Sequence, residues 1–162
     1  MDEFAKLASA ERRPFFEAAA TASGFPLQII EKDFWVCWTL KRLFSLPEVG
    51  GHLVFKGGTS LSKAFGVIER FSEDIDISID RAWLGFTGAK DPEKAPSAKQ
   101  QQRLIEELAA TCRKFVQTEM LATLEKSFGS DLERKKGWIL RIDERDPDGQ
   151  TLLFDYPTAE GC

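Results

Sequence analysis

The sequence predicts one α+β (α/β) domain, in which a helical N-terminal region packs on a mixed sheet flanked by helices. Three patterns support this fold class. Apolar residues cover most of a helical circumference across 27–46, as expected for a helix buried on several sides. The segment Asp74–Asp80 alternates acidic or polar residues with isoleucine, which is typical of a half-buried strand. Residues 97–128 carry the apolar stripe of one long amphipathic helix, or of two in series.

The first part of the chain is predicted to be helical. Residues 3–23 have apolar side chains at helical spacing, and we expect a break near Pro14. The second helix, 27–46, is stopped by Pro47. Residues 1–50 are therefore predicted to form a helical region that packs on the core.

The remaining residues, 51–162, are predicted to form that core. A short strand is expected at 52–57, and a short helix at 59–66, which begins with residues suited to an N-cap and ends at a glycine. Residues 82–98 lack periodicity and are predicted to form a loop or mobile lid. Residues 137–157 hold two apolar runs around a turn sequence, which predicts a β-hairpin.

Composition limits the class of protein. A chain of 162 residues that is 43% hydrophobic and 30% charged is typical of one globular domain with a substantial core. The formal charge of -4 creates no global attraction for nucleic acid, so any polyanion must be bound by a local patch. Three separated cysteines and a single histidine favour neither structural zinc nor a disulfide framework. Without a signal-peptide or membrane-spanning pattern, we expect a cytoplasmic protein.

Asp74 and Asp76 form the first candidate site. Side chains at i and i+2 of a strand project from one face about 6.5 to 7 Å apart, so these two carboxylates can share one ligand. Such close carboxylates repel each other unless a divalent cation lies beside them. Mg²⁺ prefers oxygen ligands and is commonly shared between one or two carboxylates and substrate phosphates. The pair therefore predicts a magnesium site.

A glycine turn supplies the second half of the site. Gly57 and Gly58 allow a sharp turn close to a ligand, and Thr59 and Ser60 stand where a helix begins with unpaired N–H groups, which favours anion binding. Nearby side chains suited to a polyphosphate are Lys56, Lys63, Arg70 and Ser72. Each motif alone is most often a plain turn or an exposed strand edge, so it is their combination in one small unit that favours a nucleotide site.

Other side chains have less specific interpretations. Trp35 and Trp38 are predicted to be core residues and not platforms for base stacking. The run Glu31–Asp33 either lines the site or forms a solvated corner of its helix. Arg134–Lys136 could contact an RNA backbone, although short basic runs are usually just solvated.

These residues resemble a known family. Gly57–Ser60, followed by Arg70–Asp76, is similar to the first motif, "GG/GS … D-x-D", of the nucleotidyltransferase superfamily with the DNA polymerase beta-like fold. More narrowly, "KGGTSLSKAF" and "ERFSEDIDISI", preceded by "EKDFWVCWTLKRLF", resemble the AbiEii/AbiGii toxin family. The close match covers about residues 31–80, with weaker support from "LLFDYP". By this resemblance, the chain would be an N-terminal portion of a longer family member, and residues 51–162 would be a nucleotidyltransferase core that is incomplete at its C-terminus.

The resemblance implies a metal-dependent nucleotidyltransferase, the toxin half of a toxin–antitoxin or phage-defence pair. It would transfer NMP from an NTP to a hydroxyl of RNA, such as tRNA, or of a protein, with a cognate antitoxin as partner. It implies that Asp74 and Asp76 hold Mg²⁺ and that Gly57 to Ser60 cradle the triphosphate, with Lys63, Arg70 and Ser72 as further contacts. Two alternatives stay open: a non-catalytic fragment that binds nucleotide or antitoxin, and transfer to a small molecule such as an aminoglycoside.

A third catalytic carboxylate is expected from the superfamily pattern. Judged from the residues, Asp155 on the last predicted strand is the candidate and Asp143 is the second choice. However, "LLFDYP" resembles a family segment that precedes the acid-bearing strand. If that alignment holds, the third carboxylate and a downstream basic residue lie outside this chain, and turnover would be poor.

Overall fold

The computed structural model describes residues 1–57, 74–132 and 137–159, so the helix predicted at 59–66 lies outside the described residues. The helices are α1 (Asp2–Lys6), α2 (Ser9–Ser23), α3 (Leu27–Phe44), α5 (Ala98–Phe115) and α6 (Leu121–Asp131). The strands are β1 (Leu53–Lys56), β2 (Asp76–Ile79), β3 (Ile139–Ile142) and β4 (Leu152–Asp155). The α+β class predicted from the sequence is confirmed.

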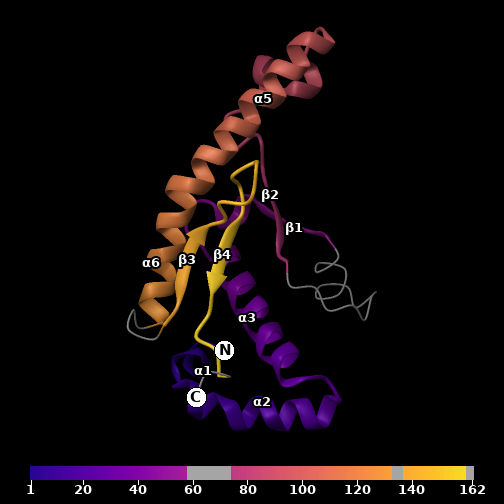
Figure 1. The fold of residues 1–162 in the computed structure, drawn as a ribbon. Coiled ribbons are helices and arrows are strands. Elements are labelled where there is room, and N and C mark those ends of the chain that lie inside the picture. Colours follow the sequence, from indigo (N-terminus) through magenta and orange to yellow (C-terminus); the bar gives the residue numbers. More distant parts are fainter. Residues whose placement is uncertain (58–73, 133–136, 160–162) are drawn as a thin grey trace.

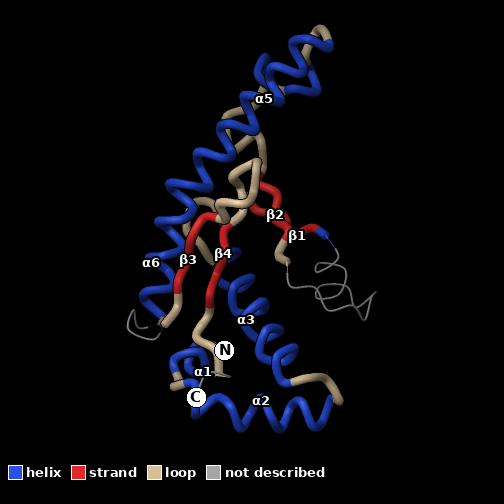
Figure 2. Tube along the Cα trace, viewed as in Figure 1, coloured by secondary structure: helices blue, strands red, loops and turns tan. Residues whose placement is uncertain are grey.

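The described strands form two separate antiparallel pairs, β1 with β2 and β3 with β4 (Figure 2). Helices α5 and α6 make a long rod on one side and are joined by the π-helical turn Val116–Met120, so of the two possibilities for 97–128, one long helix or two in series, the structure shows the second (Figure 1). Helix α2 crosses the end of the molecule opposite the free end of α5. None of the described helices is long and apolar enough to cross a membrane.

Aromatic side chains join α3, α6 and β4 into one core. Trp35 and Trp38 of α3 are 1% and 0% exposed, which confirms that they are core residues. The Trp38 ring lies 4.9 Å from that of Phe128 in α6, and Phe128 lies 4.8 Å from Phe154 in β4. Burial of such large apolar surfaces is the main favourable term in folding, and here it fixes the hairpin between two helices.

The helix break expected near Pro14 lies earlier, at Leu7 and Ala8. Ala8 has an extended backbone, and its N–H donates to Glu11 Oε2 at 2.8 Å, which begins α2. Pro14 lies inside α2 and deprives it of one backbone hydrogen bond. The helix tolerates this loss because Phe16 is buried in the fold and helps to hold it there.

Two buried charged side chains hold the segment that follows β4. Arg12 is 1% exposed and donates to the carbonyl oxygen of Pro157, while its guanidinium lies 5.1 Å from the centre of the Trp35 ring. Glu31 is also 1% exposed, and its Oε1 accepts from the Ala159 N–H at 2.7 Å. The interpretation of Glu31 as part of a solvated corner is therefore wrong. Desolvation lowers the pKa of Arg12, and the charge of Glu31 opposes that shift.

The segment 82–98, predicted to be a loop or lid, contains two 3-10 helical turns, Gly88–Lys90 and Pro92–Lys94. Asp91 begins the second turn by accepting from the Glu93 N–H at 3.1 Å. This turn packs against α5, and together they form the free end of the rod (Figure 1). Turns of three residues are too short to leave a periodic pattern in the sequence, which is why they were not predicted.

The predicted hairpin at 137–157 is confirmed, with Ile139 opposite Asp155 and Ile142 opposite Leu152. Its turn is organised by the carboxylate of Asp146. Asp146 Oδ1 accepts from the Asp148 N–H at 2.9 Å, and Oδ2 accepts from two further backbone N–H groups. The hydroxyl of Thr151, as the largest influence, and these backbone N–H groups stabilise the charged form by hydrogen bonding, which lowers the pKa of Asp146 to about 2.

Candidate functional site

The β1–β2 pair presents an apolar face to the core and a polar face away from it. Ile75, Ile77 and Ile79 pack against the core, as the alternation predicted. On the other face, Lys56 pairs with Asp76, and Val54 pairs with Ser78. Because paired residues in a sheet share a face, Lys56, Asp76 and Ser78 lie together.

Gly57 and Asp76 lie in contact at one end of this polar face. Gly57 has a φ of +75°, in the left-handed region, and a Cβ added to it would lie 1.9 Å from Asp76 Oδ2. Any side chain at position 57 would therefore collide with the carboxylate. The structure thus places the first glycine of the turn against the second acid of the Asp-x-Asp motif.

Asp74 and Asp76 are both exposed on the side away from the core. The strand begins at Asp76, so Asp74 lies just outside it, and Ile75 between them is partly buried. Two exposed carboxylates offer the hard oxygen ligands that Mg²⁺ shares with substrate phosphates. No group of three or more His, Cys, Asp or Glu side chains suited to a metal occurs in the described part of the chain. The pair fits a magnesium ion that the substrate helps to hold.

Several predicted contacts cannot be placed. They lie within 58–73, outside the described residues, and are Gly58, Thr59, Ser60, Lys63, Arg70 and Ser72. The basic run Arg134–Lys136 is outside them as well. Their roles stay predictions from the sequence.

The two candidates for a third carboxylate lie in the other strand pair. Asp155 ends β4, and its Oδ2 accepts from Arg141 Nε at 3.1 Å across the hairpin. Asp143 follows β3 and is bonded to Arg145 at 3.0 Å, which holds the pKa of Asp143 below its ordinary value. Each acid thus has an arginine partner within its own hairpin, and neither belongs to the β1–β2 pair that carries Asp76.

A polar hollow of about 450 Å³ is bordered by Lys56, the cross-strand partner of Asp76, and by Ser78 on the same face, although Asp76 itself does not line it. Its lining joins the polar face of the β1–β2 pair to the turns at 88–94, and comprises Lys56, Ser78, Ile79, Asp80, Arg81, Ala82, Phe86, Thr87, Gly88, Asp91 and Lys94. Apart from Lys56, the sequence did not point to these residues. One local signal could have located part of the lining: the dipeptide Asp91–Pro92 is a common start of a helical turn.

The charges around this hollow are arranged by one buried carboxylate. Asp91 is 8% exposed; its Oδ1 lies 3.5 Å from Arg81 Nε, and its Oδ2 lies 3.9 Å from Lys94 Nζ. Both terminal nitrogens of Arg81 also contact Glu93 at 2.7 Å. This pairing lowers the pKa of Glu93 and raises that of Arg81. The Arg81 guanidinium is therefore engaged by protein carboxylates, whereas Lys94 keeps donors available.

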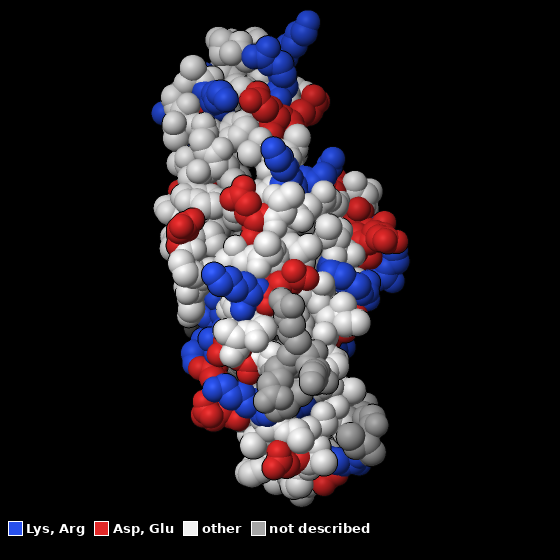
Figure 3. Space-filling view, turned by 90° about the vertical axis from the view of Figure 1, so that its left-hand side faces the viewer, with Lys and Arg blue, Asp and Glu red and all other residues white. Residues whose placement is uncertain are grey.

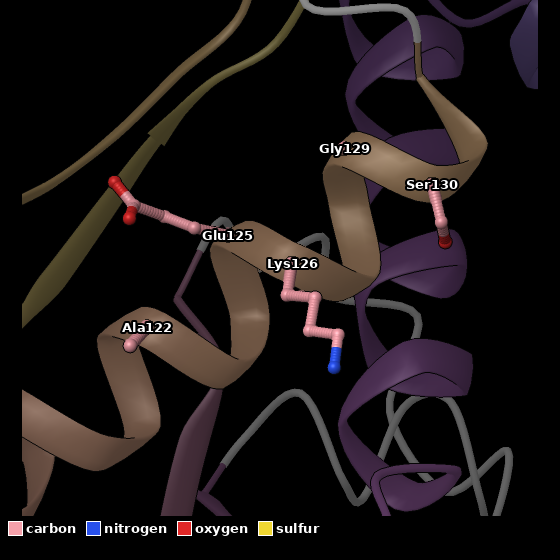
Figure 4. A pocket seen from close by; sticks show the side chains of 5 residues that line it. All are labelled: Ala122, Glu125, Lys126, Gly129 and Ser130. Atoms are coloured by element: carbon pink, nitrogen blue, oxygen red, sulfur yellow. The ribbon is translucent and has the colours of Figure 1, made fainter.

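A second hollow, of about 380 Å³, lies on α6 and is lined by Ala122, Glu125, Lys126, Gly129 and Ser130. Figure 4 shows that the Glu125 and Lys126 side chains point in different directions. Because its polar groups do not converge, this hollow has no arrangement suited to a charged ligand. On the face in Figure 3, acidic and basic side chains alternate without an extended area of one sign.

Comparison with known proteins identifies the family. No curated protein and no solved structure matched the chain. The model of one family, described as nucleotidyl transferase AbiEii toxin of a type IV toxin–antitoxin system, matches residues 38–160 and so spans Gly57, Asp74 and Asp76. The resemblance drawn from the two motifs is thereby confirmed, and the chain belongs to the AbiEii family of nucleotidyl transferase toxins.

Proposed function

We propose that this chain is a magnesium-dependent nucleotidyltransferase toxin that transfers NMP from an NTP to a hydroxyl of RNA, with tRNA as the leading candidate. The contact between Gly57 and Asp76 carries the proposal, because it joins the predicted phosphate turn to the predicted metal ligands within the family match. Membership of a toxin–antitoxin family implies an antitoxin partner and an NTP substrate.

The roles of the residues follow from their chemistry. Asp74 and Asp76 would hold Mg²⁺, which when bound neutralises phosphate charge and lowers the pKa of an attacking hydroxyl. Gly57 and the three residues after it would bind the triphosphate through backbone N–H groups, with Lys63, Arg70 and Ser72 as further contacts. Phosphoryl transfer depends mostly on positioning and charge stabilisation, which a glycine turn next to the two acids would supply.

The test is transfer of label from α-labelled NTPs to total RNA in Mg²⁺, with Asp76→Asn compared against Asp148→Asn. Asp148 is an exposed acid in the hairpin turn. We expect label in RNA with the parent chain and with Asp148→Asn. With Asp76→Asn, the rate of transfer should fall at least about 100-fold, because a group that stabilises charge in the transition state has been removed. If no NTP is transferred and none raises the melting temperature in Mg²⁺, the proposal is wrong.

A non-catalytic, nucleotide-binding role is the second candidate. The pairing of Asp155 with Arg141 favours it, because a third carboxylate committed to its own hairpin would not complete the metal site. Transfer by the parent chain separates the two candidates, and Asp155→Asn tests whether Asp155 is the third carboxylate. If transfer survives this change, Asp155 is not the third carboxylate; if NTP binding occurs in Mg²⁺ without transfer by the parent chain, the role is binding only.

A further inference from the structure

We propose that the polar hollow bordered by Lys56 and Ser78 is the acceptor subsite, in which Lys56 and Lys94 bind a phosphate near the 3′ end of an RNA strand. This inference rests on the proposed function and identifies where its second substrate binds. The hollow is lined by residues of β1, β2 and the turns at 88–94, all within the described part of the chain.

The position of the hollow follows from the direction of β2. Gly57 lies against Asp76 at the start of the strand, whereas Ser78 and Asp80 line the hollow further along it. In-line transfer places the attacking hydroxyl and the leaving pyrophosphate on opposite sides of the α-phosphate. With the triphosphate proposed at the glycine turn and the metal ligands at Asp74 and Asp76, the acceptor is assigned to the hollow, whose lining includes Lys56 and Ser78 on the same face as Asp76.

Lys56 connects the hollow to the metal ligands. It pairs with Asp76 across the two strands and also lines the hollow. Among the described residues, no ion pair engages its ammonium group. A lysine in this position can donate to an anion that lies next to the reacting phosphate.

Lys94 provides the second donor. Its side chain is 69% exposed, and its 3.9 Å contact with Asp91 is too long for a hydrogen bond. This contact therefore leaves the donors of the Lys94 ammonium group available to a ligand. Arg81, held by two carboxylates, supports this arrangement and is not needed for the ligand.

The charge balance favours a phosphodiester over a second triphosphate. Lys56, Arg81 and Lys94 are balanced by Asp80, Asp91 and by Glu93, which contacts Arg81, so this group of side chains carries no net charge. One phosphodiester carries one negative charge, whereas a triphosphate carries several and would be repelled by these acids. The hydroxyls of Ser78 and Thr87 suit a ribose or a base edge, and the volume of about 450 Å³ is within the usual range for a small-molecule site.

The experiment measures binding without turnover. A fluorescent single-stranded oligoribonucleotide is titrated with the protein in the absence of NTP at several salt concentrations. Lys56→Met and Lys94→Met are each expected to weaken RNA binding about tenfold, as for one charge-assisted hydrogen bond. Each should also reduce the slope of log affinity against log salt by about 0.7, the value for one phosphate contact on a single strand.

Two controls make the result specific. Lys126→Met, in the α6 hollow of Figure 4, should leave RNA affinity unchanged. Lys94→Arg keeps the charge and should retain most of the affinity. Melting temperatures equal to that of the parent chain would show that the methionine variants are folded, and NTP binding in Mg²⁺ should be unaffected by Lys94→Met.

Each contrary outcome has a definite meaning. Unchanged RNA affinity in both lysine variants, or an equal loss in Lys126→Met, overturns the acceptor subsite even if the chain transfers nucleotide. Loss of NTP binding in Lys94→Met would assign the hollow to the donor nucleotide, and label transferred to protein instead of RNA would exclude an RNA acceptor. If the lysine variants lose RNA binding and no transfer is detected, the hollow binds RNA, but the proposed activity fails and the hollow is not an acceptor subsite.

Discussion

Replacing Gly57 with alanine is expected to reduce activity far more than stability. The backbone at Gly57 is in the left-handed region, where an alanine lowers the stability of the fold by about 1–2 kcal/mol. For a chain of this length, that corresponds to a fall in melting temperature of about 2–8 °C. The added Cβ would lie 1.9 Å from Asp76 Oδ2, so the carboxylate must retreat by about 1.5 Å to reach the ordinary contact of 3.4 Å.

The same displacement acts directly on the proposed metal ligand. Asp76 is exposed, so its carboxylate can rotate away without a large loss of packing. A misplacement of about 1 Å in a catalytic site can cost about 100-fold in rate, so transfer should fall at least that far in Gly57→Ala. Label transfer measures the loss of activity and thermal unfolding measures the loss of stability, both on the same preparations. Gly51→Ala is the matched control, because no atom lies within 4 Å of its added Cβ.

A double variant tests whether Gly57 acts through Asp76. In an Asp76→Asn background, Gly57→Ala should cause little further loss of transfer, because the ligand that it displaces has already been removed. The reasoning is refuted if Gly57→Ala keeps parental activity, or if Gly51→Ala loses as much activity as Gly57→Ala.

Two further predictions concern the fold. Arg12→Met should lower the free energy of unfolding by about 3–5 kcal/mol, because it removes a buried guanidinium that donates to the carbonyl oxygens of Pro157 and of Leu7, in the turn before α2. We expect the melting temperature to fall by roughly 10 °C. A fall of under about 2 °C would contradict this. Asp146→Ala should lower the melting temperature at neutral pH, because the hairpin turn loses its acceptor. The native pKa of Asp146 is about 2 against an ordinary 3.8, so this contribution is present above about pH 4 and disappears as pH falls toward 2. Melting curves of parent and variant from pH 7 to pH 2 should therefore converge at the acid end, and a constant difference would contradict the assignment.

Local patterns were enough to predict most of the secondary structure. The alternation in Asp74–Asp80 predicted which isoleucines pack on the core, and the apolar stripe of 97–128 predicted that this segment is helical, in one helix or two in series. Both depend on the spacing of side chains along a single element, which the sequence contains in full. The Gly-Gly and Asp-x-Asp motifs also predicted a shared site, and the structure places Gly57 against Asp76.

Contacts between distant segments could not be predicted in this way. No local pattern marks Arg12 as buried, and Glu31 was interpreted as lining the site or forming a solvated corner, yet both are buried and contact residues 157–159. The polar hollow bordered by Lys56 and Ser78 depends on Asp91, whose turn is too short to leave a periodic signal.

The sequence by itself determined the family, most of the helices and strands, and the two motifs of the candidate site. Only the tertiary structure decided that Asp155 pairs with Arg141 within its hairpin, and that Lys56, the cross-strand partner of Asp76, lines a hollow together with Lys94. The physical reason is that periodicity and motif spacing are properties of neighbouring residues, whereas burial and ion pairing depend on which remote segments the packed core brings together.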